Sequence, residues 1–144
     1  MATTKKKKEY DLLDNIPASI DDGEILNILN DSDVNWQYVA AIKKNTEFTD
    51  NVISDWLNVS VKTFREYKKP NSAFKANVKE HVVLLLSLMK HGKAVFGSTK
   101  AFDEWLNREN FYFDHRIPMT FMNTITGIKF IDHRLTAMEY GDNV

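Results

Sequence analysis

The sequence lacks cysteine altogether and is poor in glycine and proline, with 5 and 3 among its 144 residues. The absence of cysteine excludes disulfides, thiolate catalysis and cysteine-ligated zinc. The few glycines and prolines, beside 43% hydrophobic residues, exclude disordered and collagen-like chains. The longest strongly apolar run, residues 82–89, is too short to span a bilayer, and no apolar stretch follows the basic start. We therefore expect a globular protein of the cytoplasm without membrane contact.

The net charge of −1 conceals an uneven distribution along the chain. Residues 1–8 carry a net +4, residues 9–59 a net −9, residues 60–93 a net +6 and residues 94–144 a net −2. A polyanion would be attracted to the third block and repelled by the second. The four lysines at 5–8 allow two interpretations, a solvated chain end or an arm attracted to phosphates.

The spacing of apolar residues predicts helices almost everywhere after residue 18, and no stretch shows sustained alternation. The longest predicted helix covers residues 74–91 and is apolar on all sides, so we expect it in the middle of the core, with Gly92 as a left-handed C-cap. Gly127 is predicted to break the chain between two later helices. The candidate N-caps are Ser19 or Asp21, Asp33 or Asn35, and Ser98 or Thr99. These patterns predict an all-α fold of seven or eight short helices.

Residues 50–69 meet the positional demands of a helix-turn-helix. Two short helices that cross through a tight turn need a small residue where they pass closest and a residue that tolerates a left-handed backbone at the turn. Ser54 and Asn58 occupy these two places, Ser60 stands where the second helix needs an N-cap, and Pro70 ends that helix. The wedge between the helices must be apolar, and its positions hold Ile53, Leu57, Val59, Phe64 and Tyr67.

The second helix of this motif would present polar and basic side chains to DNA. Arg65 can make a bidentate contact to guanine, and Thr63 can contact a phosphate or a thymine methyl group. Lys68 and Lys69 suit backbone phosphates. The alternative is an ordinary helical hairpin with a solvated basic face. The candidate DNA-binding residues are Ser60, Lys62, Thr63, Arg65, Lys68 and Lys69.

Patterns typical of enzymes are missing. None of the four histidines is paired with another ligand at the spacing of a zinc site, and His81 fits a partly buried core histidine. The sequence contains no glycine-rich phosphate loop and no nucleophile elbow. We predict no catalytic residues, no metal and no cofactor, and therefore a protein that is not an enzyme.

Several short motifs follow one another in a characteristic order and spacing. They are SVKTFR at 60–65, AVFG at 94–97, AFDEWL at 101–106, Asn110, Pro118 and Met119, Thr124, Gly127, Leu135 and EYG at 139–141. With them, the chain from about residue 46 to 144 resembles the antitoxins of the Xre/MbcA/ParS type, which combine a helix-turn-helix with a C-terminal toxin-binding domain. Residues 113–117 depart from the pattern, because family members often carry a glycine before the proline.

The resemblance implies a bacterial type II antitoxin. Such proteins dimerise, bind their own operator DNA as autorepressors and neutralise a toxin encoded beside them. Toxins of this family degrade NAD or transfer ADP-ribose, and the antitoxin's C-terminal region, here residues 111–144, covers their active-site cleft. The expected partners are therefore a cognate toxin in a hetero-oligomer, operator DNA, and a second copy in a homodimer. The predicted parts are a flexible basic tail (1–18), a helix-turn-helix DNA-binding region (19–72) and, packed against it, a helical toxin-binding domain (73–144).

Aromatic, methionine and arginine side chains crowd between residues 111 and 122, as in the core of a protein–protein interface. They include Phe113, Met119 and Met122, and the alternative is that they complete the core of the protein itself. The chain end could enter a cleft of a partner, with its acidic residues facing a basic pocket. The candidate toxin-binding residues are Phe111, Tyr112, Arg116, Glu139, Tyr140, Asp142 and Asn143.

Two alternative functions stay open at this point. The first is a helix-turn-helix transcription regulator whose C-terminal domain serves dimerisation or ligand sensing. The second is a toxin-binding protein that has lost DNA binding.

Overall fold

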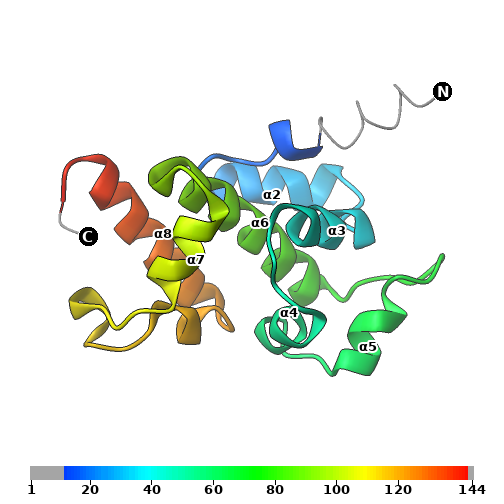
Figure 1. The fold of residues 1–144 in the computed structure, drawn as a ribbon. Helices are drawn as coiled ribbons and strands as arrows, with labels where there is room; N and C mark the ends of the chain where they lie inside the picture. The colour runs from blue at the N-terminus through cyan, green and yellow to red at the C-terminus, as the bar shows by residue number, and fades with distance from the viewer. Residues whose placement is uncertain (1–11, 143–144) are drawn as a thin grey trace.

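The computed structural model describes residues 12–142, and all regular structure in that range is helical (Figure 1). Within the same range the β-type pairing is limited to one isolated bridge between Asn110 and Arg116. The prediction of an all-α fold is therefore confirmed. The α-helices are α2 (Asp22–Asp31), α3 (Trp36–Asn45), α4 (Asp50–Trp56), α5 (Val61–Glu66), α6 (Ala76–Phe96), α7 (Thr99–Leu106) and α8 (Ile125–Glu139). The 3-10 helices η1 (Phe111–Phe113) and η2 (Pro118–Phe121) lie between α7 and α8.

Short polar side chains begin most of these helices. Asp21, Asn35 and Ser98 each accept a hydrogen bond from a backbone N–H two or three residues further on, at the starts of α2, α3 and α7. Thr124 does the same for α8. Each cap satisfies one of the donors that the first turn of a helix leaves open. For α2, α3 and α7, the sequence predicted two alternative N-caps each, and the structure shows which of the two is used.

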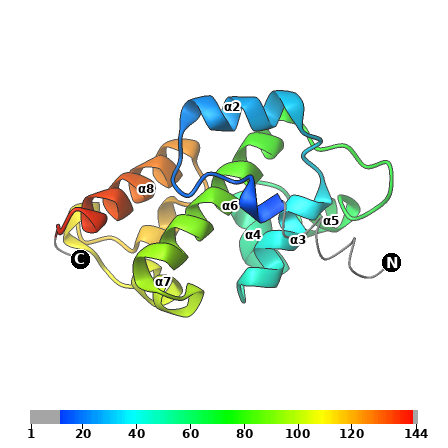
Figure 2. The same ribbon diagram turned by 90° about the horizontal axis from the view of Figure 1, so that it is seen from above.

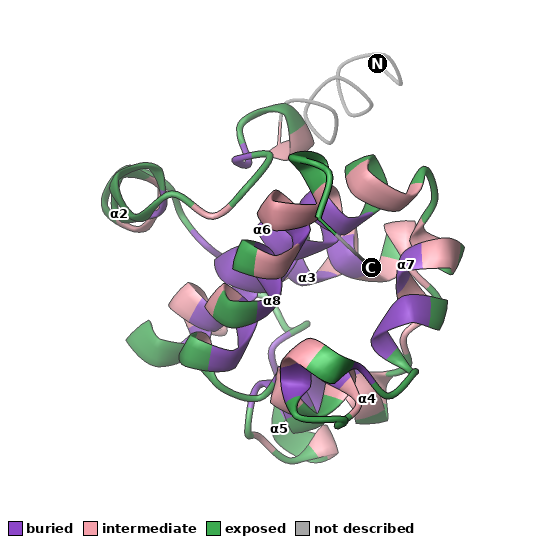
Figure 3. Cartoon of the chain, turned by 90° about the vertical axis from the view of Figure 1, so that its left-hand side faces the viewer, coloured by how far each residue is buried: buried purple, intermediate pink, exposed green. Residues whose placement is uncertain are grey.

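Helix α6 runs through the middle of the molecule, and α2, α3, α7 and α8 pack around it (Figure 2). All residues from 81 to 89 are buried, and Leu85 has no exposed surface (Figure 3). A helix that is apolar on all sides can be stable only when neighbours cover every side of it. The predicted central position of the longest helix is therefore confirmed.

The end of α6 corrects the prediction made for Gly92. The helix continues through Gly92 to Phe96, and Gly97, with a φ of 84°, is its left-handed C-cap. A Cβ atom at position 92 would overlap the ring of Phe102 on α7, so this glycine permits the close packing of α6 and α7. Gly127 likewise does not break the chain. It lies in the first turn of α8, where a Cβ atom would overlap the carbonyl oxygen of Phe121.

Residues 12–18 pack on the core and do not form a tail. Ile16 is buried, and the hydroxyl of Ser87 on α6 donates a hydrogen bond to the carbonyl of Pro17 over 2.9 Å. The ammonium group of Lys90 donates to the carbonyls of Leu13 and Ile16 over 2.8 and 2.9 Å. The predicted flexible tail over residues 1–18 is therefore wrong for residues 12–18, because polar groups of α6 hold their backbone. The lysines at 5–8 lie outside the described residues.

The N-terminal and C-terminal regions share one core. Helix α6, which begins at Ala76, packs on α2 and α3 as well as on α7 and α8, and buried apolar residues from both regions form one cluster. The side-chain amide of Asn58, in the turn after α4, also donates a hydrogen bond to the carbonyl of Asn123, just before α8, over 2.9 Å. The N-terminal helical region therefore packs directly on the C-terminal one. Between residues 12 and 142, no helix has both the length and the apolar character needed to cross a membrane.

Candidate functional site

Helices α4 and α5 form a compact two-helix unit, here called the α4–α5 unit (residues 49–67). Thr49 caps α4 by accepting from the backbone N–H of Val52 over 3.3 Å, and Ser60 caps α5 by accepting from that of Thr63 over 3.0 Å. Between the helices, Asn58 adopts the left-handed conformation with a φ of 59°. The conformation of Asn58 and the cap at Ser60 are as the sequence predicted.

The apolar wedge of the α4–α5 unit is formed largely as predicted. Ser54, where a small residue was expected, is fully buried. Phe64 packs edge-on against the ring of Trp36 on α3, with ring centroids 5.1 Å apart, so the unit is anchored on its neighbour. Of the five predicted wedge residues, the structure buries Ile53, Leu57, Phe64 and Tyr67, and leaves Val59 half-buried.

The candidate DNA-binding residues lie on α5 and directly beside it, and several of them have partners inside the protein. Helix α5 ends at Glu66, earlier than the predicted end at Pro70, so Lys68 and Lys69 lie in the turn that follows the helix. Ser60 is the N-cap, and its hydroxyl also donates to that of Thr63 over 3.0 Å. Lys69 lies 3.5 Å from the carboxylate of Glu66, and the ammonium group of Lys68 lies 5.3 Å from the centroid of the Trp36 ring. All six candidates, Ser60, Lys62, Thr63, Arg65, Lys68 and Lys69, are exposed to solvent.

Asp50 on the α4–α5 unit forms ion pairs with Lys43 and Arg65 that no sequence pattern predicted. Asp50, the first residue of α4, has one carboxylate oxygen 2.5 Å from the ammonium group of Lys43 and the other 3.6 Å from Nε of Arg65. The hydrogen bond from Lys43 lowers the pKa of the Asp50 carboxyl, and the nearby charges of Lys43 and Lys68 lower it further against the opposing effect of burial. The sequence did not indicate that Lys43 and Asp50 contact the basic segment around α5, because Lys43 lies on α3 and Asp50 on α4.

The second candidate surface lies around η1 and the end of α8. Phe111 and Tyr140 are strongly exposed, at 73% and 88%. The guanidinium carbon of Arg134, on α8, lies 3.5 Å from the centroid of the Tyr112 ring, and the same side chain donates a hydrogen bond to Asp142 over 3.0 Å. Arg134, which the sequence did not single out, thus joins two predicted toxin-binding residues that are 30 positions apart. We call Phe111, Tyr112, Arg134, Tyr140 and Asp142 the aromatic end.

The remaining predicted toxin-binding residues lie in different surroundings. Arg116 is exposed, 3.8 Å from the carboxylate of Asp114 and with its guanidinium 6.0 Å from the Phe121 ring centroid. The Glu139 carboxylate accepts a hydrogen bond from Nε2 of the buried His91, although the side chain is half exposed. Asn143 lies outside the described residues.

The crowd of aromatic and methionine residues divides between surface and core. Phe113 and Met122 are buried, so for these two the alternative of core packing is correct. Phe111, by contrast, is exposed to solvent, and two residues in the left-handed conformation, Asp114 and His115, follow η1 directly. Phe111 packs edge-on against the half-buried Tyr112, with ring centroids 5.4 Å apart, and exposed aromatic surface of this kind is typical of a protein contact surface.

The histidine and acidic side chains are the candidate metal ligands. No group of three or more histidine, aspartate or glutamate side chains between residues 12 and 142 is arranged to hold a metal ion. His81 is a buried core histidine, as predicted: its ring bonds the carbonyl of Met122 over 2.9 Å, and burial lowers its pKa.

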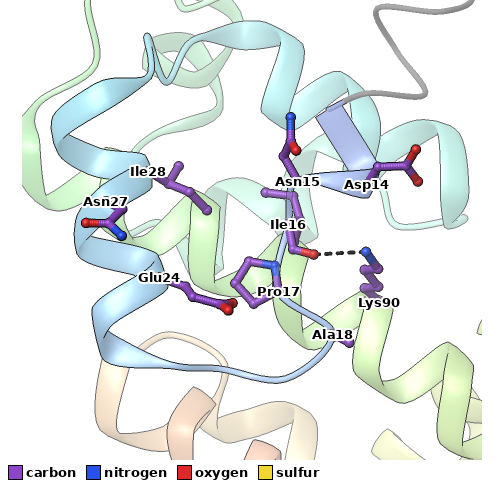
Figure 4. Close-up of a pocket in the computed structure, with 9 residues that line it drawn as sticks. All are labelled: Asp14, Asn15, Ile16, Pro17, Ala18, Glu24, Asn27, Ile28 and Lys90. Atoms are coloured by element: carbon purple, nitrogen blue, oxygen red, sulfur yellow. Dashed lines mark hydrogen bonds between the residues drawn. The ribbon is translucent and has the colours of Figure 1, made fainter.

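A pocket of about 510 Å³ lies between residues 14–18 and α2 (Figure 4). The ammonium group of Lys90 at its edge is held by the carbonyl of Ile16. The pocket contains carboxylates, amides and apolar groups but no histidine or hydroxyl nucleophile, so we assign it no reaction. Its lining residues are Asp14, Asn15, Ile16, Pro17, Ala18, Glu24, Asn27, Ile28 and Lys90.

The structure is an all-α protein with two candidate surfaces, the α4–α5 unit and the aromatic end, on one shared core. Residues 91–141 match the family model described as the antitoxin Xre/MbcA/ParS C-terminal toxin-binding domain. The match covers about a third of the chain, and the C-terminal part of this protein is similar to the toxin-binding domain of antitoxins of the Xre/MbcA/ParS type. The aromatic end lies almost entirely within the matched residues. A search of curated proteins gave no match.

Proposed function

We propose that this protein is an antitoxin and an autorepressor. Its C-terminal domain, residues 73–144, binds a cognate toxin and covers the toxin's active site. Its helix-turn-helix region, residues 19–72, binds operator DNA. The observation that carries the proposal is the match of residues 91–141 to an antitoxin toxin-binding domain, combined with an exposed aromatic end inside that match.

The aromatic end supports toxin binding through its chemistry. Tyrosine and arginine side chains are enriched among the residues that dominate protein–protein affinity, and phenylalanine is enriched at the core of interfaces. The cation–π contact between Arg134 and Tyr112, together with the ion pair of Arg134 with Asp142, holds this surface in one arrangement before a partner arrives. A preorganised surface loses less conformational entropy on binding. The toxin-binding residues in this proposal are Phe111, Tyr112, Arg116, Glu139, Tyr140, Asp142 and Asn143.

The toxin in this proposal degrades NAD or transfers ADP-ribose. This step rests on the family resemblance, whose toxins have that chemistry. The antitoxin itself carries out no reaction and needs no cofactor. It acts where operator DNA lies, in the cytoplasm.

The α4–α5 unit supports DNA binding through its shape and charge. A second helix with an exposed basic face, steeply turned from a first helix, is the arrangement that places side chains in the major groove. Arg65 can read guanine, while Lys68 and Lys69 can contact phosphates. In the proposal the protein binds as a homodimer, so its operator would be an inverted repeat with half-sites about one helical turn apart.

The experiment that tests the antitoxin role uses the gene beside the one for this protein. Expression of the neighbouring product alone should stop growth and lower cellular NAD, and co-expression of the full chain should restore both. The two proteins should also purify together. A matched pair of variants sharpens the result: Phe111→Asp on the aromatic end should abolish rescue, whereas Lys62→Asp on α5 should preserve it.

The outcomes separate the antitoxin from its alternatives. Absence of rescue and of co-purification would contradict the antitoxin proposal and favour a helix-turn-helix regulator with a dimerisation or ligand-sensing domain. Rescue without salt-sensitive binding to the protein's own promoter would favour a toxin-binding protein that has lost DNA binding.

A further inference from the structure

Asp50 holds cationic side chains from two different helices at the same time. Its oxygen Oδ1 lies 2.5 Å from Nζ of Lys43 on α3, and its oxygen Oδ2 lies 3.6 Å from Nε of Arg65 on α5. The Asp50 side chain is 19% exposed, whereas that of Arg65 is 64% exposed. The carboxylate is therefore a fixed, half-buried anchor, and the guanidinium that it touches reaches into solvent.

The atom through which Arg65 is held matters for what it can still bind. A guanidinium presents five N–H donors in a rigid plane, and the contact to Asp50 uses the Nε edge. The two terminal nitrogens lie in the same plane, at the end of the side chain beyond Nε. Guanine offers two acceptors, O6 and N7, in the major groove, and arginine contacts them with two donors at once.

Asp50 contributes to folding through its pair with Lys43 and its place in the first turn of α4, but neither contribution requires the contact with Arg65. An ion pair with an exposed arginine contributes little to folding, because water and salt screen it. A carboxylate on a DNA-binding face also repels phosphates and so lowers affinity for every sequence. A carboxylate that holds the Arg65 guanidinium in one orientation can instead improve discrimination between bases.

We propose that Asp50 is a specificity-determining residue, which orients the Arg65 guanidinium through Nε so that its terminal nitrogens contact one guanine of the operator. Lys43 contacts the other carboxylate oxygen of Asp50 and so helps to fix the orientation of this side chain. The inference rests on the DNA-binding function proposed above. The lowered pKa of the Asp50 carboxyl keeps it ionised at neutral pH, as this role requires.

The test begins with the full-length wild type and a duplex library of randomised sequence. Duplexes that the protein retains are sequenced, and each guanine of the consensus is replaced in turn by adenine for measurement of Kd. Wild type should prefer guanine at one position by about 10- to 100-fold, the range expected for a good bidentate contact. Asp50→Asn should reduce that preference to a few-fold, with equal or tighter binding to unrelated duplexes.

The matched control is Glu66→Gln, which removes the same charge from the same unit but from the partner of Lys69. It should raise affinity for all duplexes and leave the guanine preference as in wild type. Arg65→Lys keeps the charge but lacks the planar fork, so it should lose the preference as Asp50→Asn does. In an Arg65→Ala background, Asp50→Asn should have no further effect on the preference. Thermal melting of each variant shows that the fold is retained.

Three results would overturn the inference: an unchanged guanine preference in Asp50→Asn, a uniform gain in affinity without loss of preference, or an effect of Asp50→Asn that persists without Arg65. The second would make Asp50 a mere source of repulsion. If the wild type enriches no duplex, the DNA-binding proposal itself fails, and the inference fails with it.

Discussion

Nδ1 of His91 on α6 lies 2.6 Å from a carboxylate oxygen of Asp132 on α8, and both side chains are almost fully buried. Nε2 of the same imidazole bonds Glu139, and the other oxygen of Asp132 accepts from the backbone N–H of Ile20 over 3.1 Å. Burial lowers the pKa of His91, but hydrogen bonds to Asp132 and Glu139 outweigh it, so the net pKa is raised. A charged histidine thus joins the two largest helices to the segment before α2.

This arrangement predicts a pH dependence of stability. Because the pKa of His91 is higher in the folded state than its ordinary value of 6.5, its contribution is complete below that value and is lost as pH rises through the raised pKa. His91→Gln should therefore destabilise the protein by about 3 kcal/mol at about pH 6, and by less at about pH 9. Urea unfolding across this range measures the difference. The exposed His133 supplies the control variant, His133→Gln, and an equal effect of His91→Gln at both ends of the range would contradict the prediction.

Removing a buried side chain of α6 should lower the stability of the protein. Leu85 has no exposed surface and lies in the middle of the helix that all four neighbours cover. Leu85→Ala should lower the free energy of unfolding by about 2–5 kcal/mol, read from urea midpoints at constant m-value. Leu26→Ala on α2, where the side chain is 58% exposed, should change it by less than about 0.5 kcal/mol. Similar midpoints for the two variants would exclude a central α6.

Gly92→Ala should destabilise the protein even though alanine is the better helix former by about 1 kcal/mol. The new methyl group would collide with the ring of Phe102, and overpacking of this kind costs about 1–3 kcal/mol. Adding Phe102→Leu should make the double variant more stable than the sum of the single changes predicts. Thermal unfolding of the four proteins checks this, and a Gly92→Ala variant as stable as wild type would show that α6 and α7 do not approach so closely.

Lys68→Ala should weaken binding to all duplexes alike and reduce the salt dependence of binding by about one ion. Arg65→Ala should cost about 1–3 kcal/mol and relax sequence preference, because it removes a base contact. Fluorescence anisotropy over a series of salt concentrations distinguishes the two effects. Lys100→Ala removes an exposed positive charge from α7 and serves as the control. If it acts like Lys68→Ala, the effect reflects net charge and not the α4–α5 unit.

Phe111→Ala should reduce the affinity for the toxin by at least about tenfold, as expected for an aromatic residue at the centre of an interface. The side chain is 73% exposed, so the variant should melt at nearly the same temperature as wild type. Titration calorimetry with the purified toxin measures the affinity, and Leu26→Ala, an equally apolar change on α2, is the control. Unchanged affinity of Phe111→Ala would remove η1 from the toxin-binding surface.

Local patterns in the sequence predicted the helices and their starts well. The caps at Asp21 and Ser98, the left-handed Asn58 and the buried α6 depend on residues close together in the chain, where spacing and residue type are informative. Gly92 shows the limit of such patterns. A glycine that ends a helix and one that lets a neighbouring ring approach look alike in sequence, and only the position of Phe102 separates them.

The candidate surfaces could be predicted only in part for the same reason. The basic residues on and after α5 lie within one short segment and were predicted, but Asp50 and Lys43 approach Arg65 from two other helices. Arg134 contacts both Tyr112 and Asp142, and the spacing of these residues in the sequence does not predict either contact. The sequence predicted a tail over residues 12–18 because their anchoring groups, Ser87 and Lys90, lie 70 or more positions away.

The shared core has a consequence for any attempt to divide the protein into separately working halves. A chain cut before residue 73 would strip α2, α3 and residues 12–18 from α6 and leave a long apolar stripe facing water, with a strong tendency to aggregate. The two faces therefore cannot be expected to survive as isolated fragments. Single substitutions on an intact fold are the way to separate them, and a destabilising change anywhere along α6 should impair both together.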